Sequence, residues 1–188
     1  MSGSWFSTVA SETRYRGFSD VVVDTVEMPD GSQVEREVVH HDDAVAVVPV
    51  LDDGRVLLLK QYRQPLRGHL LELPAGKMDV DDEPPEEVAR RELAEETGHA
   101  ARELRHLTTF HNSAGWSTER THVFLATGVH ATHPPDGFVP QAEEAVMELV
   151  PFTLPDALEA TRTGQLTDGK TVIGLLLAEP HLTGGRTA

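Results

Sequence analysis

The sequence has no cysteine among its 188 residues, which excludes a disulfide scaffold, a zinc-thiolate or iron–sulfur site, and thiol catalysis. Basic residues are also scarce, since 16 lysines and arginines stand against 31 acidic residues and give a net charge of −15. Such a chain is poorly suited to nucleic acid, which proteins hold by neutralising phosphate. Apolar stretches such as Ala44–Leu51 are far shorter than the roughly 20 residues that span a bilayer.

The amino-terminal residues show no basic start followed by an apolar core, so we expect no secretory signal. Together with the composition, this predicts a cytoplasmic globular protein with no nucleic-acid partner and no membrane partner. The length suits one domain with a small extension, and a chain of this size buries enough surface to fold without crosslinks.

Two β-branched segments near the amino terminus, 17–27 and 33–40, flank the sequence Pro29-Asp30-Gly31. Proline fixes φ and glycine accepts a positive φ, so this sequence favours a tight turn and predicts a β-hairpin. Two continuous apolar segments follow at 43–51 and 55–62. Continuous apolar character is typical of strands that are buried on both faces, so it predicts a sheet covered on both sides.

A charged, alanine-rich segment predicts a helix from about Pro84 to Thr97, with Asp81 or Asp82 as its cap and Gly98 as its end. The sequence further predicts strands over 103–110, 121–127 and 145–150, and helices over 153–164 and 167–178. This order of elements indicates the α/β class, with a mixed sheet and helices on its faces.

Three glutamates of the predicted helix share one face. At about 100° per residue, Glu92, Glu95 and Glu96 project within an arc of roughly 100°. Like charges at this spacing repel, and more so when they are partly buried, so a divalent cation would remove the conflict. Hard carboxylate and carbonyl oxygens, without histidine or thiolate, suit Mg²⁺ or Mn²⁺. A bare acidic run is more often a solvated helix face, and the loop before the helix favours the metal site here.

Two neighbours support the same site. We expect Gly76 to turn the chain tightly, so that the backbone carbonyl of Ala75 points at the cation. Arg91 lies four residues before Glu95, where its guanidinium can hold that carboxylate in one rotamer.

The segment from Gly76 to Gly98 resembles the Nudix box, whose pattern is G-x5-E-x7-R-E-U-x-E-E-x-G-U. The matching residues here are Gly76, Glu83, Arg91, Glu92, Leu93, Glu95, Glu96 and Gly98. The sequence departs from the pattern twice: six residues, not five, separate Gly76 from Glu83, and His99 replaces a large aliphatic residue. The spacing from Glu83 to Arg91 is intact, so the helix itself should be undisturbed.

The resemblance extends to the ADP-ribose pyrophosphatase branch of that family and covers about residues 12–180. It is carried by Gln61-Tyr62-Arg63, by 72–76, by the 115–119 loop and by 168–171. Ala114 occupies a position where the branch commonly has proline, which leaves the substrate more open than the metal site. The resemblance implies a Nudix-type α/β/α sandwich over residues 43–180, a β-hairpin extension over 1–42 and a tail over 181–188.

The activity that the resemblance implies is Mg²⁺-dependent hydrolysis of the diphosphate bond of ADP-ribose, which yields AMP and ribose 5-phosphate. Mn²⁺ is a possible substitute for Mg²⁺. The alternatives are a hydrolase of another nucleoside diphosphate sugar, a dinucleotide or a nucleoside triphosphate, and a non-catalytic sensor of ADP-ribose-like ligands. Retention of all three box glutamates favours catalysis over sensing.

The resemblance also assigns roles to single residues. Glu92 and Glu96 are implied as direct metal ligands with the Ala75 carbonyl, and Glu95 as the holder of another metal or its water, while Glu83 is implied as a structural or outer-shell member. The general base is expected to be Glu143 or Glu144, since the branch uses a glutamate on a mobile loop outside the box.

Three further residues are expected to touch the substrate. Arg63 offers a planar donor fork to phosphate. Arg36 could reach the nucleotide from a partner subunit, because the branch forms homodimers, and Glu119 could border the terminal ribose. For each of these, and for the loop glutamates, the plainer alternative is an ordinary surface residue.

Overall fold

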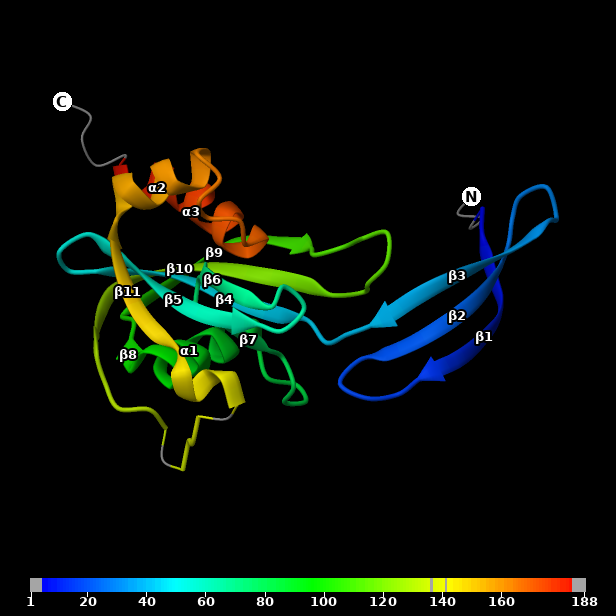
Figure 1. Cartoon of the computed structure of the whole chain (residues 1–188), viewed down its shortest axis with the longest axis horizontal. Helices are drawn as coiled ribbons and strands as arrows, with labels where there is room; N and C mark the ends of the chain where they lie inside the picture. The colour runs from blue at the N-terminus through cyan, green and yellow to red at the C-terminus, as the bar shows by residue number, and fades with distance from the viewer. Residues whose placement is uncertain (1–4, 136, 141, 184–188) are drawn as a thin grey trace. The chain divides into compact units, whose positions relative to one another are not determined.

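The computed structural model describes residues 5–135, 137–140 and 142–183 (Figure 1). Its elements in chain order are β1 (Ser7–Tyr15), β2 (Asp20–Glu27), β3 (Gln33–His40), β4 (Ala44–Leu51), β5 (Arg55–Arg63), β6 (Gly68–Glu72), β7 (Ala75–Lys77), α1 (Pro85–Thr97), β8 (His99–Ala100), β9 (Glu103–His111), β10 (Arg120–Ala131), the 3₁₀ helix η1 (Ala142–Val146), β11 (Glu148–Thr153), α2 (Leu154–Arg162) and α3 (Gly169–Thr183). None of the helices in this described part has the length and apolar content that crossing a membrane requires.

The chain divides into two compact units. The amino-terminal unit comprises Met1–Asp43 and His111–Arg120, and the core unit comprises Ala44–Phe110 and Thr121–Ala188. In the amino-terminal unit, β2 and β3 form the predicted antiparallel hairpin, with Gly31 at a φ of 81° in its turn. The sequence did not reveal β1, which pairs with β2 and extends the hairpin to a three-stranded sheet.

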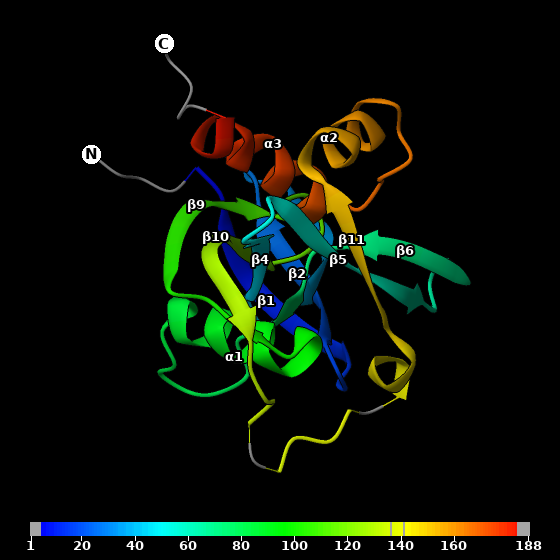
Figure 2. The same ribbon diagram turned by 90° about the vertical axis from the view of Figure 1, so that its left-hand side faces the viewer.

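The core unit contains a mixed sheet, as predicted. Its main path runs β11-β5-β4-β10-β8, while β6 pairs with β5, β7 with β4, and β9 with β10. Strands β4 and β10 are parallel, and the other pairs whose register is resolved are antiparallel. Helix α1 covers one face of this sheet, and α2 and α3 cover the opposite face (Figures 1 and 2).

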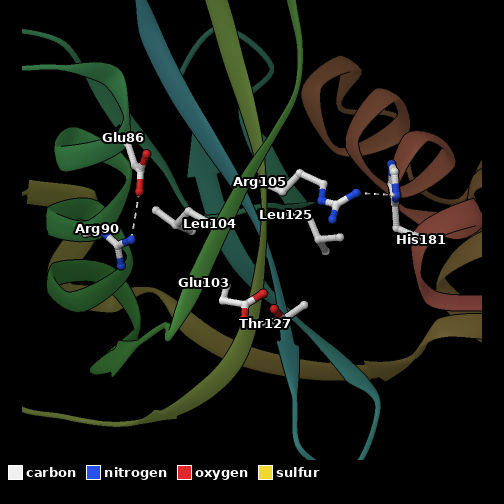
Figure 3. A pocket seen from close by; sticks show the side chains of 8 residues that line it. All are labelled: Glu86, Arg90, Glu103, Leu104, Arg105, Leu125, Thr127 and His181. Atoms are coloured by element: carbon white, nitrogen blue, oxygen red, sulfur yellow. Dashed lines mark hydrogen bonds and ion pairs between the residues drawn. The ribbon is translucent and has the colours of Figure 1, made fainter.

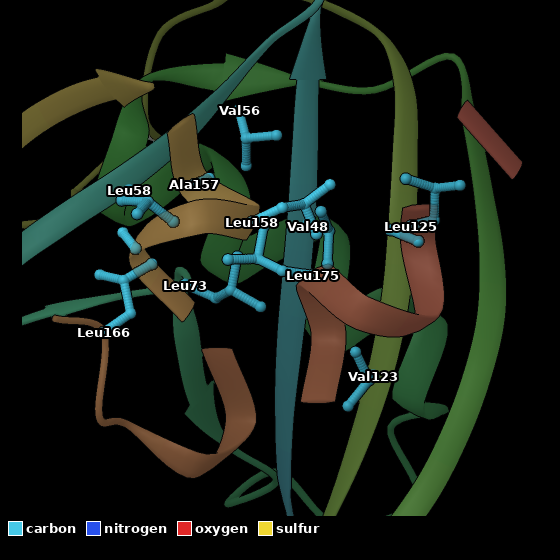
Figure 4. Packing of buried hydrophobic residues seen from close by; sticks show 12 residues of the cluster. Val48, Val56, Leu58, Leu73, Val123, Leu125, Ala157, Leu158, Leu166 and Leu175 are labelled. Atoms are coloured by element: carbon cyan, nitrogen blue, oxygen red, sulfur yellow. The ribbon is translucent and has the colours of Figure 1, made fainter. Parts of the chain in front are cut away.

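Side-chain alternation along β4 explains why both faces are covered. Val45 and Val47 pack against Leu93 in a cluster with α1, whereas Val48 joins Leu175 and residues of α2 in a second cluster (Figure 4). Residues 45–49 are therefore buried on whichever side they point. This confirms the prediction drawn from the continuous apolar run.

Helix α1 occupies the predicted segment and ends as expected. Gly98 adopts the left-handed conformation at φ 65°, and its N–H donates to the Ala94 carbonyl at 3.0 Å. The predicted cap at Asp81 or Asp82 is wrong. Pro84 takes the N-cap position with extended backbone and without a side-chain hydrogen bond, so the helix starts too late for either aspartate to cap it.

Other boundaries also differ from the prediction. The strand expected over 145–150 begins only at Glu148, because η1 occupies the residues before it. The last helix does not stop before Pro180 but continues through it to Thr183. Proline cannot donate to the carbonyl four residues earlier, on Leu176, and that residue is exposed, so water can satisfy its carbonyl.

Candidate functional site

The loop that enters α1 is shaped by one close contact. Gly76 lies within β7 and pairs with Val45, and it does not have a positive φ, so the expected tight turn is wrong. Its lack of a side chain matters for another reason. A Cβ at this position would lie 1.9 Å from Cδ of Glu92 and 2.2 Å from each of its carboxylate oxygens. Glycine is required here because the carboxylate of Glu92 rests against the backbone.

The acidic face of α1 gathers around Arg91. One guanidinium nitrogen, Nη1, donates to Glu92 at 2.7 Å and to Glu95 at 3.2 Å, which confirms the expected contact with Glu95. The other, Nη2, donates to Glu83 at 3.2 Å and lies 3.7 Å from a carboxylate oxygen of Asp79. Four carboxylates therefore share a single positive charge.

This imbalance of charge shifts the pKa values of Glu92 and Arg91. Burial raises the pKa of Glu92 to about 7, with further contributions from Glu95 and Asp79, and the charge of Arg91 offsets only part of the rise. Burial alone would lower the pKa of Arg91, but its carboxylate neighbours outweigh that effect and raise it. Within the described residues, the buried Nε of Arg91 has no hydrogen-bond partner. The cluster therefore has too little positive charge for its carboxylates, and none of these carboxylates accepts a hydrogen bond from Nε of Arg91.

Glu96 contacts the same strand, β7, one residue before Gly76. Its Oε2 accepts a hydrogen bond from the backbone N–H of Ala75 at 2.8 Å, which joins the helix to the residue whose carbonyl is expected to bind metal. As the side chains stand, no three carboxylate or imidazole groups of the described residues are arranged to chelate an ion. The donor set nevertheless fits a hard divalent cation, because it consists of oxygens that carry more negative charge than Arg91 neutralises. The ligand set Ala75, Glu92, Glu95 and Glu96 stays a prediction.

Arg63, the expected phosphate contact, has a partner that the sequence analysis missed. Its Nε and Nη2 donate to the two carboxylate oxygens of Glu72 at 2.7 and 2.6 Å. Glu72 is 1% exposed and also accepts from Lys170, which in turn donates to Asp168 at 3.0 Å. A single charge inside the apolar run 70–73 was the one signal in the sequence that pointed to a buried ion pair here.

The remaining predicted residues are more scattered. Glu143 is exposed on η1, and the side chain of Glu144 lies outside the described part of the structure. Arg36 is exposed on β3, where its Nη1 donates to the Glu35 carbonyl at 2.8 Å. Glu119 lies 3.9 Å from a ring nitrogen of His41. Arg36 and Glu119 belong to the amino-terminal unit, whereas the box glutamates belong to the core unit.

A cavity of about 510 Å³ in the core unit is lined by residues of α1, β9, β10 and α3 (Figure 3), and none of the box carboxylates is among them. Its α1 residues, Glu86 and Arg90, lie about 120° and 160° from Glu92 around the helix axis. Its two arginines, Arg90 and Arg105, are matched in number by two glutamates, Glu86 and Glu103, and Arg90 donates to Glu86 at 2.9 Å. Equal numbers of arginines and glutamates leave the lining without the excess of positive charge that would hold a diphosphate, so the cavity is not the candidate active site.

Comparison with known proteins adds independent observations. The family model described as NUDIX domain matches residues 40–169. The chain is 38% identical over 169 residues to the ADP-ribose pyrophosphatase of Bacillus subtilis (strain 168), covering 89% of each chain. It is 36% identical over 180 residues to the ADP-ribose pyrophosphatase of Mycobacterium tuberculosis (strain ATCC 25618 / H37Rv), covering 95% of this chain and 86% of the relative. A crystal structure of an ADP compounds hydrolase has the same fold, with a TM-score of 0.83 over the whole of both chains at 21% identity.

Proposed function

Since the chain belongs to the NUDIX family, we propose that it is a Mg²⁺-dependent pyrophosphatase that hydrolyses ADP-ribose to AMP and ribose 5-phosphate. A hydrolase of nucleoside diphosphate compounds is supported by both ADP-ribose pyrophosphatase relatives. The observation that carries the proposal is the convergence of Glu83, Glu92 and Glu95 on one guanidinium. That cluster needs a further cation, and a diphosphate substrate needs the same cation to approach a chain of net charge −15.

The cation would be held by Glu92, Glu95 and Glu96 together with the Ala75 carbonyl, and Mn²⁺ could replace Mg²⁺ because both prefer oxygen ligands. When bound, it supplies positive charge that neutralises the diphosphate and polarises its P–O bonds. The residues of the chain then position the other reactants. The Glu96 carboxylate fixes the loop through the Ala75 N–H, which keeps the carbonyl donor beside the helix.

Hydrolysis also requires a group that takes a proton from the attacking water. Glu143 and Glu144 are our candidates, because both belong to η1, just before β11, which pairs directly with the central strand β5. Glu95 is a third candidate, since its carboxylate belongs to the same cluster, 3.2 Å from Nη1 of Arg91. As water attacks phosphorus, the bridging P–O bond breaks and the carboxylate accepts the water proton.

Contacts with the substrate are proposed for Arg63, Arg36 and Glu119. The guanidinium of Arg63 uses Nε and Nη2 for Glu72, so Nη1 lies on the side away from that carboxylate and can donate to a phosphate oxygen. Arg36 would contact the nucleotide and Glu119 the terminal ribose.

We also propose a homodimer that uses the amino-terminal sheet. Every residue of β1 is exposed, including Val9 at 49% and Tyr15 at 61%, and Trp5 and Phe18 nearby are exposed at 78% and 76%. A three-stranded sheet with this much exposed apolar surface gains stability when a second copy covers it. In sedimentation velocity, the wild-type chain should have the mass of a dimer, and Val9→Arg should shift it towards the monomer. A wild-type monomer at micromolar concentration would contradict the proposal.

Substrate identity is tested with a panel. The protein is incubated with Mg²⁺ and, separately, ADP-ribose, a second nucleoside diphosphate sugar, a dinucleotide and a nucleoside triphosphate, and the products are separated by ion-exchange chromatography. We expect AMP and ribose 5-phosphate from ADP-ribose at the highest kcat/KM. If ADP-ribose survives and another compound is consumed, that other compound is the substrate of the same hydrolytic reaction. Tight binding of ADP-ribose without any turnover would instead indicate a sensor.

A further inference from the structure

The Glu72 carboxylate is buried between two cations that come from distant parts of the chain. Arg63, at the end of β5, binds both of its oxygens, and Lys170, in the first turn of α3, binds Oε2. The side chain of Lys170 is 13% exposed and that of Glu72 only 1%, whereas 40% of the Arg63 side chain is exposed. The inner end of this network is therefore sealed, and the outer end reaches the surface of the core unit.

Stability alone is a poor reason for such a network. Desolvating a carboxylate and an ammonium costs several kcal/mol per ion, and buried ion pairs are often no more stable than apolar residues of similar size. Burial raises the pKa of Glu72, but the hydrogen bonds and charges of Arg63 and Lys170 outweigh it, so the pKa lies below its ordinary value and the carboxylate stays charged. Because the Glu72 carboxylate is charged and buried, it favours one orientation of the exposed Arg63 guanidinium.

The first turn of α3 is itself held in place. Asp168 accepts from the Thr171 N–H at 3.0 Å and from its hydroxyl at 2.6 Å, which caps the helix, and it also accepts from Lys170 at 3.0 Å. The Thr171 hydroxyl accepts from the Leu73 N–H at 2.8 Å. At Gly174, an added Cβ would lie 2.6 Å from Leu73, so the helix packs directly on the residue that follows Glu72.

At the outer end, the guanidinium of Arg63 is fixed by two parallel hydrogen bonds. This fork-to-fork geometry allows little rotation and sets the direction of the third nitrogen, Nη1. Glu72, which holds the guanidinium, lies three residues before Ala75, and the Ala75 N–H donates to the box residue Glu96 at 2.8 Å. The charge of Glu96 also contributes, after that of Glu72, to the raised pKa of Arg63. The fixed donor therefore lies in the neighbourhood of the proposed metal ligands.

We propose that Lys170, oriented by Asp168, is a positioning residue that holds Arg63 through Glu72 so that Nη1 of Arg63 donates to a diphosphate oxygen of the substrate. This inference rests on the proposed function. Lys170 does not touch the substrate, and its contribution passes entirely through Arg63. Loss of Lys170 leaves Glu72 with a single partner, which loosens the anchor and the direction of the donor.

A double-mutant cycle tests this chain of contacts. Lys170→Met, Arg63→Met and the double variant are compared by steady-state kinetics on ADP-ribose, or on the panel member that the wild type cleaves best. We expect each single substitution to lower kcat/KM by about 10-fold or more, the effect of one charge-assisted hydrogen bond. In the Arg63→Met background, Lys170→Met should change kcat/KM by less than about 2-fold, and Lys170→Arg should restore most of the wild-type value.

Three controls make the result decisive. Lys60→Met removes a lysine of β5 whose pair with Glu148, at 3.1 Å, is exposed, and it should leave kcat/KM unchanged. If Lys170→Met fails to fold, the combination Glu72→Gln with Lys170→Met removes the buried charge together with its partner, and should show the same kinetic loss. Circular dichroism before each assay verifies the folded fraction.

The outcomes separate the two proposals. If the two single-substitution losses in kcat/KM multiply in the double variant, the positioning role is overturned. The same holds if folded Lys170→Met keeps the wild-type kcat/KM. Neither result would contradict the proposed hydrolase. A wild-type protein that cleaves no member of the panel would overturn the proposed function itself.

Discussion

Alanine in place of Gly76 would put a methyl group where the Glu92 carboxylate now lies. The added Cβ would stand 1.9 Å from Cδ of Glu92, and ordinary van der Waals contact begins at 3.4 Å, so the carboxylate must retreat by about 1.5 Å. The obstacle is the end of a flexible side chain and not the backbone. The retreat should therefore cost no more than the roughly 1–3 kcal/mol typical of an overpacked site.

Catalysis should suffer far more than stability. A displacement of about 1 Å at a reacting centre costs on the order of 100-fold in rate, so Gly76→Ala should lower kcat at least about 100-fold. For a chain of this size, a loss of about 1–3 kcal/mol corresponds to a Tm that falls by about 2–12 °C. The expected signature is a folded protein with an impaired site.

The assay measures kcat with Mg²⁺ and the preferred substrate, alongside Tm from circular dichroism. Gly68→Ala is the matched control, because its nearest heavy atom, the Leu66 carbonyl oxygen, would lie at an ordinary 3.7 Å from the new Cβ. The control should retain wild-type turnover. A Gly76→Ala protein with turnover within about 3-fold of wild type would refute the contact between Glu92 and the β7 backbone as a feature of the working site.

Two predictions concern single glutamates of α1. Because folding raises the pKa of Glu92 to about 7 from 4.5, its carboxyl keeps a proton that the unfolded chain releases between these values. In the presence of a chelator, the free energy of unfolding should therefore fall as the pH rises through that window, and it should fall more steeply in wild type than in Glu92→Gln. If urea titrations give the two proteins the same dependence of unfolding free energy on pH, the prediction is contradicted. Glu96→Gln keeps an oxygen that can accept from Ala75 N–H, so Tm should persist while kcat falls by orders of magnitude; unchanged kcat would show that Glu96 does not bind the metal.

Local signals explain what could be predicted of the fold and the site. Helix α1 was predictable because the prolines before it, Gly98 after it and the spacing of its glutamates all act within a few residues. The contact of Arg91 with Glu95 follows from helix geometry alone. Burial of β4 on both faces was predictable from its continuous apolar run, since alternate residues of one strand serve both clusters.

Contacts between distant residues explain what was missed. Lys170 and Glu72 are 98 positions apart, and no local pattern links them. The need for glycine at position 76 comes from Glu92 on another element, so the sequence suggested a turn where the structure has a crowded strand. Strand β1 escaped notice because its residues do not alternate regularly between apolar and polar, and its pairing with β2 is interrupted by two register shifts.

A comparison of Glu72 with Glu92 indicates where a cation is needed. Both carboxylates are buried, with 1% and 9% of their surfaces exposed. Glu72 faces two positive charges and has a lowered pKa, whereas Glu92 shares the single charge of Arg91 with other carboxylates and has a raised pKa. Burial alone would push both values upwards, so the balance of neighbouring charge decides the difference. A divalent cation therefore gains most at the α1 cluster, and the same reasoning assigns the Glu72 network a role in orientation and not in metal binding.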